Sequence, residues 1–338
     1  MGRVMAKVTI EDISRFTGLS RGTVSRALND RPDISVQTRQ RVLEACRSLN
    51  YSPSHAARCL AMGRAFAVAV LVDDLQAVFA ATFLRGVLAR ARAAHYAVFV
   101  AELGQDEGRQ LEAVEGAVGE RIDCVLVSSP LSAGVTPVLM ERLSGRPAIA
   151  CLPLDGLNCD LLMPDQVESG RLLAQHLLDD VGGPVLYVHG LDRPGATERL
   201  RGFEQCLQER GLDPVAHRFD VPQQRPLPEE LENELVGRLR GTRAVGASDD
   251  LLALELLSYC WLAGRRPGRD IAVMGQGNER CAARIDPPLT STDWCGEEIG
   301  RRALEILLAR VEKLRLDAPV SNYVAPVLCR RASTQLTR

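Results

Sequence analysis

The sequence predicts an α/β protein with a small helical head and a much larger α/β body. Residues 8–64 hold three short helical patterns, each behind a capping residue. From residue 65 onward, apolar strand-like runs alternate with helical patterns. The segment up to Arg64 carries 11 basic and 5 acidic side chains, a net charge of +6, whereas the remaining residues carry a net charge of −8. A basic head on an acidic body indicates that the head meets a polyanion such as DNA.

The first two helical patterns of the head are joined by a tight turn. Thr9 is expected to cap the first helix, with Asp12 three residues further on in a capping-box relation. Gly18 supplies the backbone freedom for the turn, and Ser20 caps a second helix that ends near Leu28. Two short helices joined in this way, with a supporting third, are typical of a helix-turn-helix module. The alternative, a small bundle without a nucleic-acid role, is disfavoured by the close spacing of the caps and by the positive charge.

The third helical pattern starts after Ser35 and supplies much of the apolar core expected for the head. Outward-facing positions on the second helix are Arg21, Gly22, Ser25 and Arg26. The positions expected to be buried are Ile10, Ile13, Phe16, Val24, Leu28, Val36, Val42, Leu43, Cys46 and Leu49.

The body has the pattern of a parallel sheet protein. The strand candidates are Ala67–Val72, Tyr96–Val100, Cys124–Ser128, Ala148–Leu152, Val185–His189, Val245–Ala247 and Ile271–Gly275. The helical candidates between them are 79–94, 107–120, 166–180, 198–210 and 250–263. Alternating buried strands and helices predict parallel sheets with right-handed crossovers. Such sheets bind ligands at the carboxyl ends of their strands.

Composition and motif content exclude several classes of protein. The longest uncharged apolar run has eight residues and the N-terminus lacks a signal-peptide pattern, so a cytoplasmic protein is expected. The ten cysteines form no C-x2-C pair, which predicts reduced thiols. The five histidines have no metal-ligand spacing, and no G-x-S-x-G or Walker motif occurs, so no enzyme activity, metal or other cofactor is expected. A solute-binding module for transport would suit the body alone, but not the basic head.

Many positions of the head match a known family pattern in register. The matching segments are Val8–Ile13, Thr17–Ser20, Thr23–Arg26, Ile34–Ser35, Thr38–Arg39, Val42, Leu49–Tyr51, Pro53, Ala57 and Leu60. Through them the chain resembles the lactose/galactose repressor family of transcriptional regulators, and the resemblance continues to the C-terminus. Through Val185–His189 and Phe203 the body looks closer to the fructose-repressor and gluconate-repressor branches. The resemblance implies a DNA-binding repressor of transcription, typically for genes of carbohydrate metabolism.

The resemblance also implies which residues contact DNA. Arg21 and Gly22 match the two positions that choose bases in the major groove, and Arg26 matches an arginine that reads a guanine or a phosphate. A bidentate arginine–guanine contact contributes about 1–3 kcal/mol of discrimination. Because Gly22 has no side chain, Arg21 is expected to carry more of the choice. The full set of implied DNA contacts is Thr9, Ser20, Arg21, Gly22, Thr23, Ser25, Arg26, Asn29, Ser35, Thr38, Asn50, Tyr51, Ser54, Ala57 and Leu60.

Residues 53–64 resemble the hinge helix and linker of the family. Ser54 would cap the helix, and Ala57 is small enough to let two hinge helices pack in the minor groove. Leu60 matches the leucine that wedges between base pairs. So short a helix is unstable alone, so its order is expected to depend on DNA and on a dimeric body.

By the same resemblance, the body consists of two doubly wound parallel-sheet lobes of the periplasmic-binding-protein type. The implied domains are a helix-turn-helix DNA-binding domain at 1–52, the hinge and linker at 53–64, and an effector-binding and dimerisation domain at 65–338. The first lobe is expected at about 65–162 and 293–320, and the second at about 163–292 and 321–338. The three crossovers are expected near 160–164, 290–294 and 318–322.

The resemblance further implies a small-molecule effector in the cleft between the lobes. The positions that match effector contacts are Asp73, Gln76, Phe79, Asp165, Arg193, Arg199, Asp249, Gln276, Asn278 and Trp294. The aspartate that commonly grips a sugar is replaced by Gly277. The effector is expected to be a sugar, a sugar phosphate or a sugar acid. With Arg193 and Arg199 near the mouth, the missing aspartate favours one of the two acidic classes.

Structural alternatives stay open for several of these residues. Asp165 and Asp250 fit helix caps, Arg199 fits a surface charge, and Trp294 fits a core residue. In the implied mechanism a homodimer binds a pseudo-palindromic operator, and the effector shifts the lobes and thereby the hinge helices. Whether the effector is an inducer or a corepressor stays open. No leucine heptad follows Arg330, which predicts a dimer rather than a tetramer.

Overall fold

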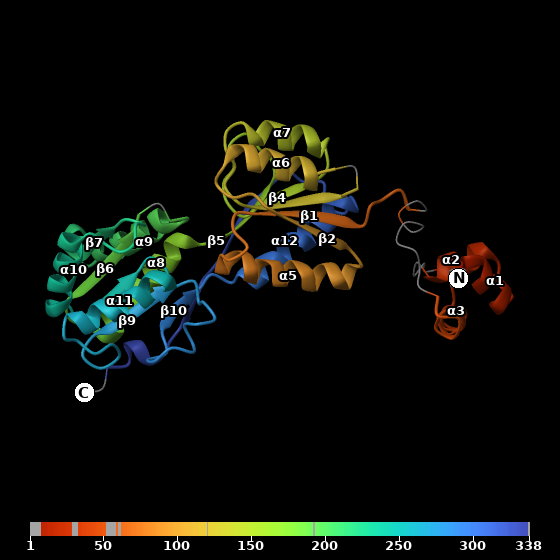
Figure 1. The fold of residues 1–338 in the computed structure, drawn as a ribbon. Coiled ribbons are helices and arrows are strands. Elements are labelled where there is room, and N and C mark those ends of the chain that lie inside the picture. The colour runs from red at the N-terminus through yellow and green to blue at the C-terminus, as the bar shows by residue number, and fades with distance from the viewer. Residues whose placement is uncertain are drawn as a thin grey trace, which may run out of the picture. The chain divides into compact units, whose positions relative to one another are not determined.

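A computed structural model describes residues 8–28, 33–51, 59, 62–119, 121–191 and 193–336 of the chain. The chain divides into two units, with the boundary between Ala65 and Phe66 (Figure 1). In the described residues, no helix is long and apolar enough to cross a membrane.

The first unit is a three-helix domain. Its helices are α1 (Ile10–Thr17), α2 (Arg21–Leu28) and α3 (Val36–Ser48). The Asp12 carboxylate accepts hydrogen bonds from the Thr9 backbone nitrogen at 2.9 Å and from the Thr9 hydroxyl at 2.7 Å, so this end of α1 is capped. Gly18 ends α1 in the left-handed region, at φ 68°. The core contains Ile13, Val24, Ala27, Val42, Ala45 and Cys46.

Three of the apolar positions expected in this core are exposed instead. Phe16 is 60% exposed, Val36 76% and Leu43 40%. On α3 the buried or partly buried side chains of Val42, Ala45, Cys46 and Leu49 follow helical spacing, and Val36 and Leu43 lie on a neighbouring face. In the described residues of the head, this second face is exposed.

The second unit contains two six-stranded sheets that define two lobes. The sheet of the first lobe has the order β11-β5-β4-β3-β1-β2 and is parallel throughout. Its strands are β1 (Ala67–Val72), β2 (Ala97–Glu102), β3 (Cys124–Ser128), β4 (Ala148–Ala150), β5 (Asp160–Pro164) and β11 (Ser321–Val324). Its helices are α5 (Val78–Ala94), α6 (Glu107–Ala117), α7 (Val135–Leu143) and α12 (Gly296–Val311).

The sheet of the second lobe has the order β12-β10-β9-β8-β6-β7 and is parallel except for β12, which pairs antiparallel with β10. Its strands are β6 (Val185–Gly190), β7 (Arg218–Val221), β8 (Ala244–Ala247), β9 (Ala272–Gln276), β10 (Thr290–Asp293) and β12 (Val327–Cys329). Its helices are α8 (Gln166–Gln175), which continues as a π-helical turn at His176–Val181, α9 (Ala196–Gln208), α10 (Glu229–Gly241) and α11 (Asp250–Leu262). Short 3-10 turns lie at Val215–His217 and Ala332–Thr334.

The chain passes between the two sheets three times. It crosses at residue 165 between β5 and α8, at 294–295 between β10 and α12, and at 325–326 between β11 and β12. The third crossing was expected near 318–322, with all of 321–338 in the second lobe, and this is wrong. Residues 321–324 form β11, whose Tyr323 lies opposite Met163 of β5 in the first sheet.

Each lobe contains one pair of helices in backbone contact. In the first lobe, a Cβ atom added at Gly86 of α5 would overlap the carbonyl oxygen of Glu297 on α12, and one at Gly300 of α12 would overlap that of Phe83 on α5. In the second lobe, a Cβ atom at Gly202 of α9 would overlap the carbonyl oxygen of Val167 on α8. Only glycine allows so close an approach, so these residues fix how the helices of each pair lie against each other.

We expect Gly202→Ala to lower the free energy of unfolding of the second unit by about 3 kcal/mol or more, because its methyl group meets backbone that cannot yield cheaply. Gly237→Ala is the matched control, since Gly237 lies in α10 with nothing within 4 Å of an added Cβ. There alanine should stabilise the helix by about 1 kcal/mol. Urea denaturation followed by circular dichroism measures both. Equal effects from the two substitutions would contradict the backbone contact.

Candidate functional site

The start of α2 presents basic side chains to solvent. Arg21 and Arg26 have side chains that are 66% and 54% exposed. Arg21 lies 3.2 Å from Glu11 and Arg26 lies 3.6 Å from Asp33, and such exposed ion pairs contribute little. Ser20 caps the helix by accepting a hydrogen bond from the Thr23 backbone nitrogen at 3.1 Å. Both arginines are therefore available to a ligand on this surface.

Gly22 is not required by the packing of the head. It is exposed, and a Cβ atom added there would meet only the Ser20 hydroxyl oxygen, at an ordinary 3.7 Å. A side chain would fit at this position without disturbing the fold. Gly22 therefore affects the surface beside Arg21 and not the packing of the head.

The other residues predicted to contact DNA lie mostly at exposed or half-buried helix ends. Thr9 is held by Asp12, and Ser35 caps α3 by accepting a hydrogen bond from the Thr38 backbone nitrogen at 3.1 Å. Asn50 has a positive φ of 51°, and the next residue, Tyr51, donates its backbone N–H to the Cys46 carbonyl at 2.8 Å. Ser25 is half-buried on α2. Four predicted residues lie outside the described residues: Asn29, Ser54, Ala57 and Leu60.

A cavity of about 750 Å³ lies between the two lobes of the second unit. We call it the interlobe cleft. Residues that follow strands of the first sheet line one side, including Asp73 after β1, Cys151 after β4 and Pro164 at the end of β5. Helix starts of the second lobe line the other side, with Asp165 and Gln166 at α8 and Pro194, Gly195, Glu198 and Arg201 at α9. The cleft thus lies at the carboxyl ends of parallel strands, where such folds bind ligands.

Four of the ten predicted effector contacts line this cleft. They are Asp73, Phe79, Asp165 and Trp294. The Asp165 carboxylate also caps α8, since it accepts a hydrogen bond from the Glu168 backbone nitrogen at 2.9 Å. The capping role of Asp165 is therefore confirmed, and the same residue lines the cleft. The remaining six residues are not among those that line the cleft.

Arg199 is buried beneath the cleft rather than exposed in it. Its side chain is 1% exposed, which also excludes the surface-charge alternative. It donates hydrogen bonds to the Gln166 side-chain oxygen at 2.6 Å and to the Pro194 carbonyl at 3.0 Å. Its guanidinium carbon lies 4.7 Å from the centroid of the Trp294 ring. Burial lowers the pKa of Arg199. The side chain is held by the protein on several sides.

Arg193 and Asp249 pair with each other. The Arg193 guanidinium donates to the Asp249 carboxylate at 2.8 Å, and both side chains are at most 20% exposed. The other carboxylate oxygen of Asp249 accepts a hydrogen bond from the Leu252 backbone nitrogen and so caps α11. Asp249, not Asp250, is therefore the cap of this helix.

Gln276 and Asn278 are engaged by neighbouring protein groups, and Gln76 is exposed. Gln276 is fully buried; it accepts a hydrogen bond from the Ser169 hydroxyl at 2.7 Å and donates to the Ala247 carbonyl at 3.1 Å. Asn278 donates its amide to Asp293 at 2.8 Å and accepts from Arg331 at 2.5 Å. Gln76 lies on the exposed loop after β1.

Gly277 lies against the ring of Trp294. Its φ of +117° is one that other residues rarely adopt, and a Cβ atom there would come within 3.4 Å of the tryptophan ring. The Trp294 indole N–H donates to the Ser169 hydroxyl at 3.2 Å, which fixes the ring. Trp294 is thus both packed against its neighbours and part of the cleft wall. The tryptophan ring thus packs against the position where the resemblance would place a carboxylate.

Several charged or polar residues of the cleft wall were not predicted, and five of them matter for a ligand. They are Asp74, Gln166, Glu198, Arg201 and Tyr323. Asp74, Gln166, Glu198 and Arg201 lie within two positions of predicted contacts, which is the signal that could have found them. Tyr323 could not be found in this way, because its strand was expected to be a crossover.

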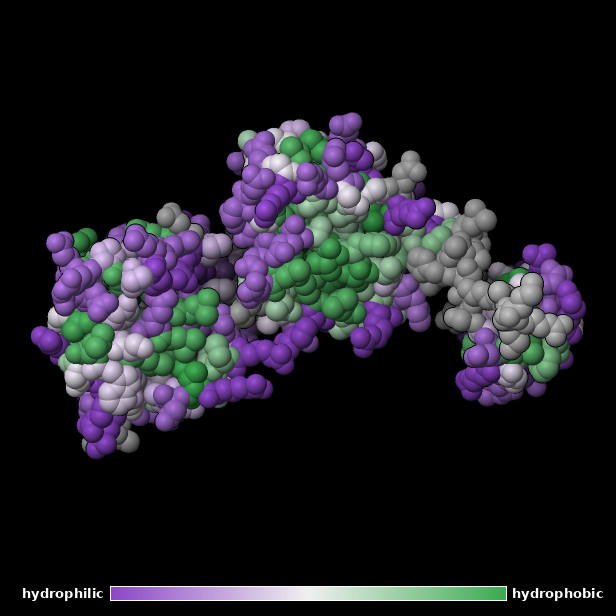
Figure 2. Space-filling view, viewed as in Figure 1, coloured by the Kyte–Doolittle hydropathy of each residue, from purple (hydrophilic) through white to green (hydrophobic). Residues whose placement is uncertain are grey.

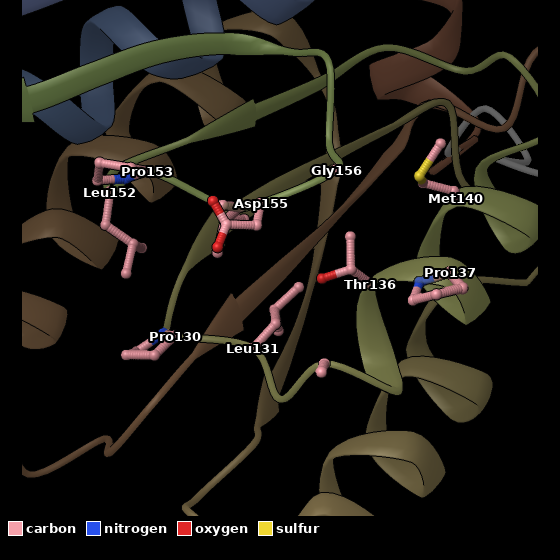
Figure 3. Close-up of a pocket in the computed structure, with 11 residues that line it drawn as sticks. Pro130, Leu131, Thr136, Pro137, Met140, Leu152, Pro153, Asp155 and Gly156 are labelled. Carbon is pink, nitrogen blue, oxygen red and sulfur yellow. The ribbon is translucent and has the colours of Figure 1, made fainter.

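A second hollow of about 690 Å³ adjoins the cleft on the first lobe (Figure 3). Pro130, Leu152 and Pro153 line both cavities. The start of α7 contributes Pro137 and Met140 to the hollow, and its lining is largely apolar. No predicted effector contact lines it.

Asp250 lies fully buried at the start of α11. Its carboxylate accepts hydrogen bonds from the Ser291 hydroxyl at 2.7 Å and from the Glu279 backbone nitrogen at 2.6 Å. Burial outweighs these bonds and raises the pKa of Asp250 to about 7. This carboxyl group therefore changes its protonation state within the physiological pH range.

A measurable pH dependence is expected from the raised pKa of Asp250, since its contribution to stability is complete below pH about 4 and is lost as pH rises through about 7. For Asp250, urea denaturation of the wild-type chain and of Asp250→Asn between pH 5 and 8 isolates the effect. The difference between the unfolding free energies of the wild-type chain and Asp250→Asn should change with pH by about 4 kcal/mol at most. A Glu230→Gln control, at an exposed position of α10, should leave the wild-type pH dependence unchanged; parallel curves for wild type and Asp250→Asn would contradict the raised pKa.

Replacing Gly22 by alanine should raise the stability of the head by about 1 kcal/mol, because a helical glycine is replaced where space is open. Gly18→Ala serves as the control, since Gly18 has a φ of +68° and alanine should cost about 1–2 kcal/mol there. Thermal denaturation of the full chain, followed at the head transition, reports both changes. Destabilisation by Gly22→Ala would show that the packing of the head requires this glycine.

Two family models and several known proteins match the chain. Residues 9–54 match the model of bacterial regulatory proteins, lacI family, and residues 165–334 match that of the periplasmic binding protein-like domain. The HTH-type transcriptional repressor PurR of Mannheimia succiniciproducens is 27% identical over 307 residues, which cover 90% of this chain and 92% of that protein. Catabolite control protein A of Priestia megaterium is 26% identical over 320 residues, covering 93% and 95%.

The fold is similar to that of solved repressor structures. A lac repressor dimer bound to operator and the anti-inducer ONPF superposes with a TM-score of 0.74 at 22% identity, and the match covers 98% of this chain and 100% of that one. At this level of identity the likeness concerns the fold.

Proposed function

Since the chain belongs to the lacI family of bacterial regulatory proteins, we propose that it represses transcription by binding a pseudo-palindromic operator as a homodimer, under the control of a small metabolite in the interlobe cleft. DNA binding and regulation of transcription are properties of this family. The operator, the dimer and the effector site are the parts that we propose. Because its target is DNA, we assign the protein to the cytoplasm.

The observation that supports the proposal most is the exposed pair Arg21 and Arg26 on the second helix of a helix-turn-helix unit. In this motif the second helix enters the major groove with its first residues toward the bases. Arg21 is the first residue of α2, and Arg26 lies five residues further along. Gly22 leaves open space beside Arg21, so a guanidinium there has room to align with a base edge.

Two exposed apolar faces of the second unit support a dimer. One includes Leu88 on α5 and Phe99 and Val100 on the edge strand β2, each more than 40% exposed. Figure 2 shows apolar surface gathered over α5 and again on the second lobe. The other face belongs to α11, which is mostly apolar and exposes Trp261 and Leu262, each by 61%. Apolar faces of this kind favour association with another chain.

Control by an effector is supported by the cleft between the lobes. A ligand that contacts both lobes favours one arrangement of them over others, and the three crossings allow the lobes to move relative to each other. If that arrangement also changes the spacing of the two heads of a dimer, operator affinity and ligand affinity become coupled. The coupling is reciprocal, whichever sign it has.

Selection from a random pool of duplex DNA tests the proposal. We expect the full chain to enrich a sequence with two inverted half-sites. Arg21→Ala should weaken binding to that sequence about tenfold or more, because one base contact is lost, and should change binding to unrelated DNA far less at equal salt.

Arg15→Ala is the matched control, since Arg15 is exposed on α1 and its loss removes the same charge from a helix that is not the recognition helix. Enrichment of a single half-site would contradict the dimer. Equal losses from Arg21→Ala and Arg15→Ala on the selected DNA would contradict the role of Arg21 in base recognition.

A further inference from the structure

The wall of the interlobe cleft is rich in carboxylates and poor in cations. Asp73, Asp74, Asp165 and Glu198 line it, whereas Arg201 is the cation among the described residues of the wall. Asp74 and Glu198 are exposed, and Asp73 and Asp165 are half-buried. The balance of formal charge at this surface is therefore negative.

Two of the arginines near the cleft, Arg193 and Arg199, are held by other protein groups, although the buried Nε atom of Arg199 has no hydrogen-bond partner among the described residues. Arg193 is neutralised by Asp249 at 2.8 Å. Arg199 is held by Gln166 and Pro194 beneath the ring of Trp294. Even when the charge of Arg199 is counted with the wall, acidic groups remain in excess. A phosphate or carboxylate in the cleft would meet this excess, and Arg201 is the guanidinium of the described wall with which it could pair.

Aromatic rings complete the wall. Phe79, Trp294 and Tyr323 line the same cavity, and they come from the start of α5, the second crossing and β11. Aromatic faces attract cations and stack on flat or ring-shaped ligands. Trp294 is fixed by its hydrogen bond to Ser169, so this part of the wall is preformed. A cavity of about 750 Å³ has the size of ordinary small-molecule sites.

We propose that the effector is a small organic cation, a protonated amine carried on a ring, which the carboxylates of the cleft pair with and the aromatic side chains pack against. This inference rests on the proposed function, because it names the ligand class of the same cleft. Crowding of like charges supports it. Burial raises the pKa of Asp73, with the neighbouring Asp74 adding to the effect, and a bound cation would relieve that repulsion.

Ligands that share one ring and differ in charge test the inference. Glucosamine, glucose, gluconate and glucose 6-phosphate form one set, and benzylamine and benzoate form a second that lacks hydroxyl groups. The full chain carries two tryptophans, so Trp261→Phe leaves Trp294 as the reporter. In this variant we expect the amines to change tryptophan fluorescence with dissociation constants about tenfold or more below those of their neutral and anionic counterparts.

A double variant, Asp74→Asn with Glu198→Gln, removes two charges from the wall while Asp165 keeps its cap on α8. It should lose most of the preference for the amines. Glu229→Gln, at an exposed position in the first turn of α10, is the control and should keep that preference. Thermal denaturation verifies that each variant folds.

Equal or tighter binding of gluconate, glucose 6-phosphate or benzoate would overturn the inference, as would a preference for amines that survives in the double variant. Either result would leave the operator selection described above untouched. Failure of that selection would instead remove the proposed regulator and leave the charge preference of the cleft as measured.

Discussion

Backbone contact between paired helices is the constraint on which the interlobe cleft depends. In the first lobe Gly86 and Gly300 bring α5 against α12, and in the second Gly170 and Gly202 bring α8 against α9. The first turns of α5, α8 and α9 carry part of the cleft wall, including Phe79. A shift in either pair would move cleft residues that are far apart in sequence. Glycines remote from any ligand thereby set the geometry of the site.

Trp294 decides what the second lobe offers to a ligand. It covers the Arg199 guanidinium at 4.7 Å, and Gly277 leaves room for its ring. The substitution of glycine for a gripping aspartate, noted in the sequence, is therefore linked to a tryptophan seventeen positions later. An arginine that resembles a ligand contact in sequence becomes the support of an aromatic wall. Apart from Arg201 and a few neutral polar groups such as Gln166, the described side chains that line the cavity are acidic, aromatic or apolar.

Sequence patterns predict those parts of the fold whose stability is local. The apolar runs of β1 and β3 define both strands to the residue, and the caps of α1 and α3 are confirmed by Asp12 and Ser35. Strand β10 escapes prediction because its residues, T-S-T-D, are polar, and three of them are buried only through tertiary partners such as Ser333. The same holds for the site. Whether Arg199 points to ligand, solvent or core depends on Gln166 and Trp294, which no local pattern brings to it.

Coupling between cleft and operator is the central claim, and one measurement tests it directly. Operator affinity of the full chain is measured by fluorescence anisotropy with and without a saturating amine ligand, and ligand affinity is measured with and without operator. Linked binding predicts that both affinities change in the same direction and by the same factor, typically 5-fold to 150-fold. An operator affinity that is the same at every ligand concentration would contradict control by the cleft.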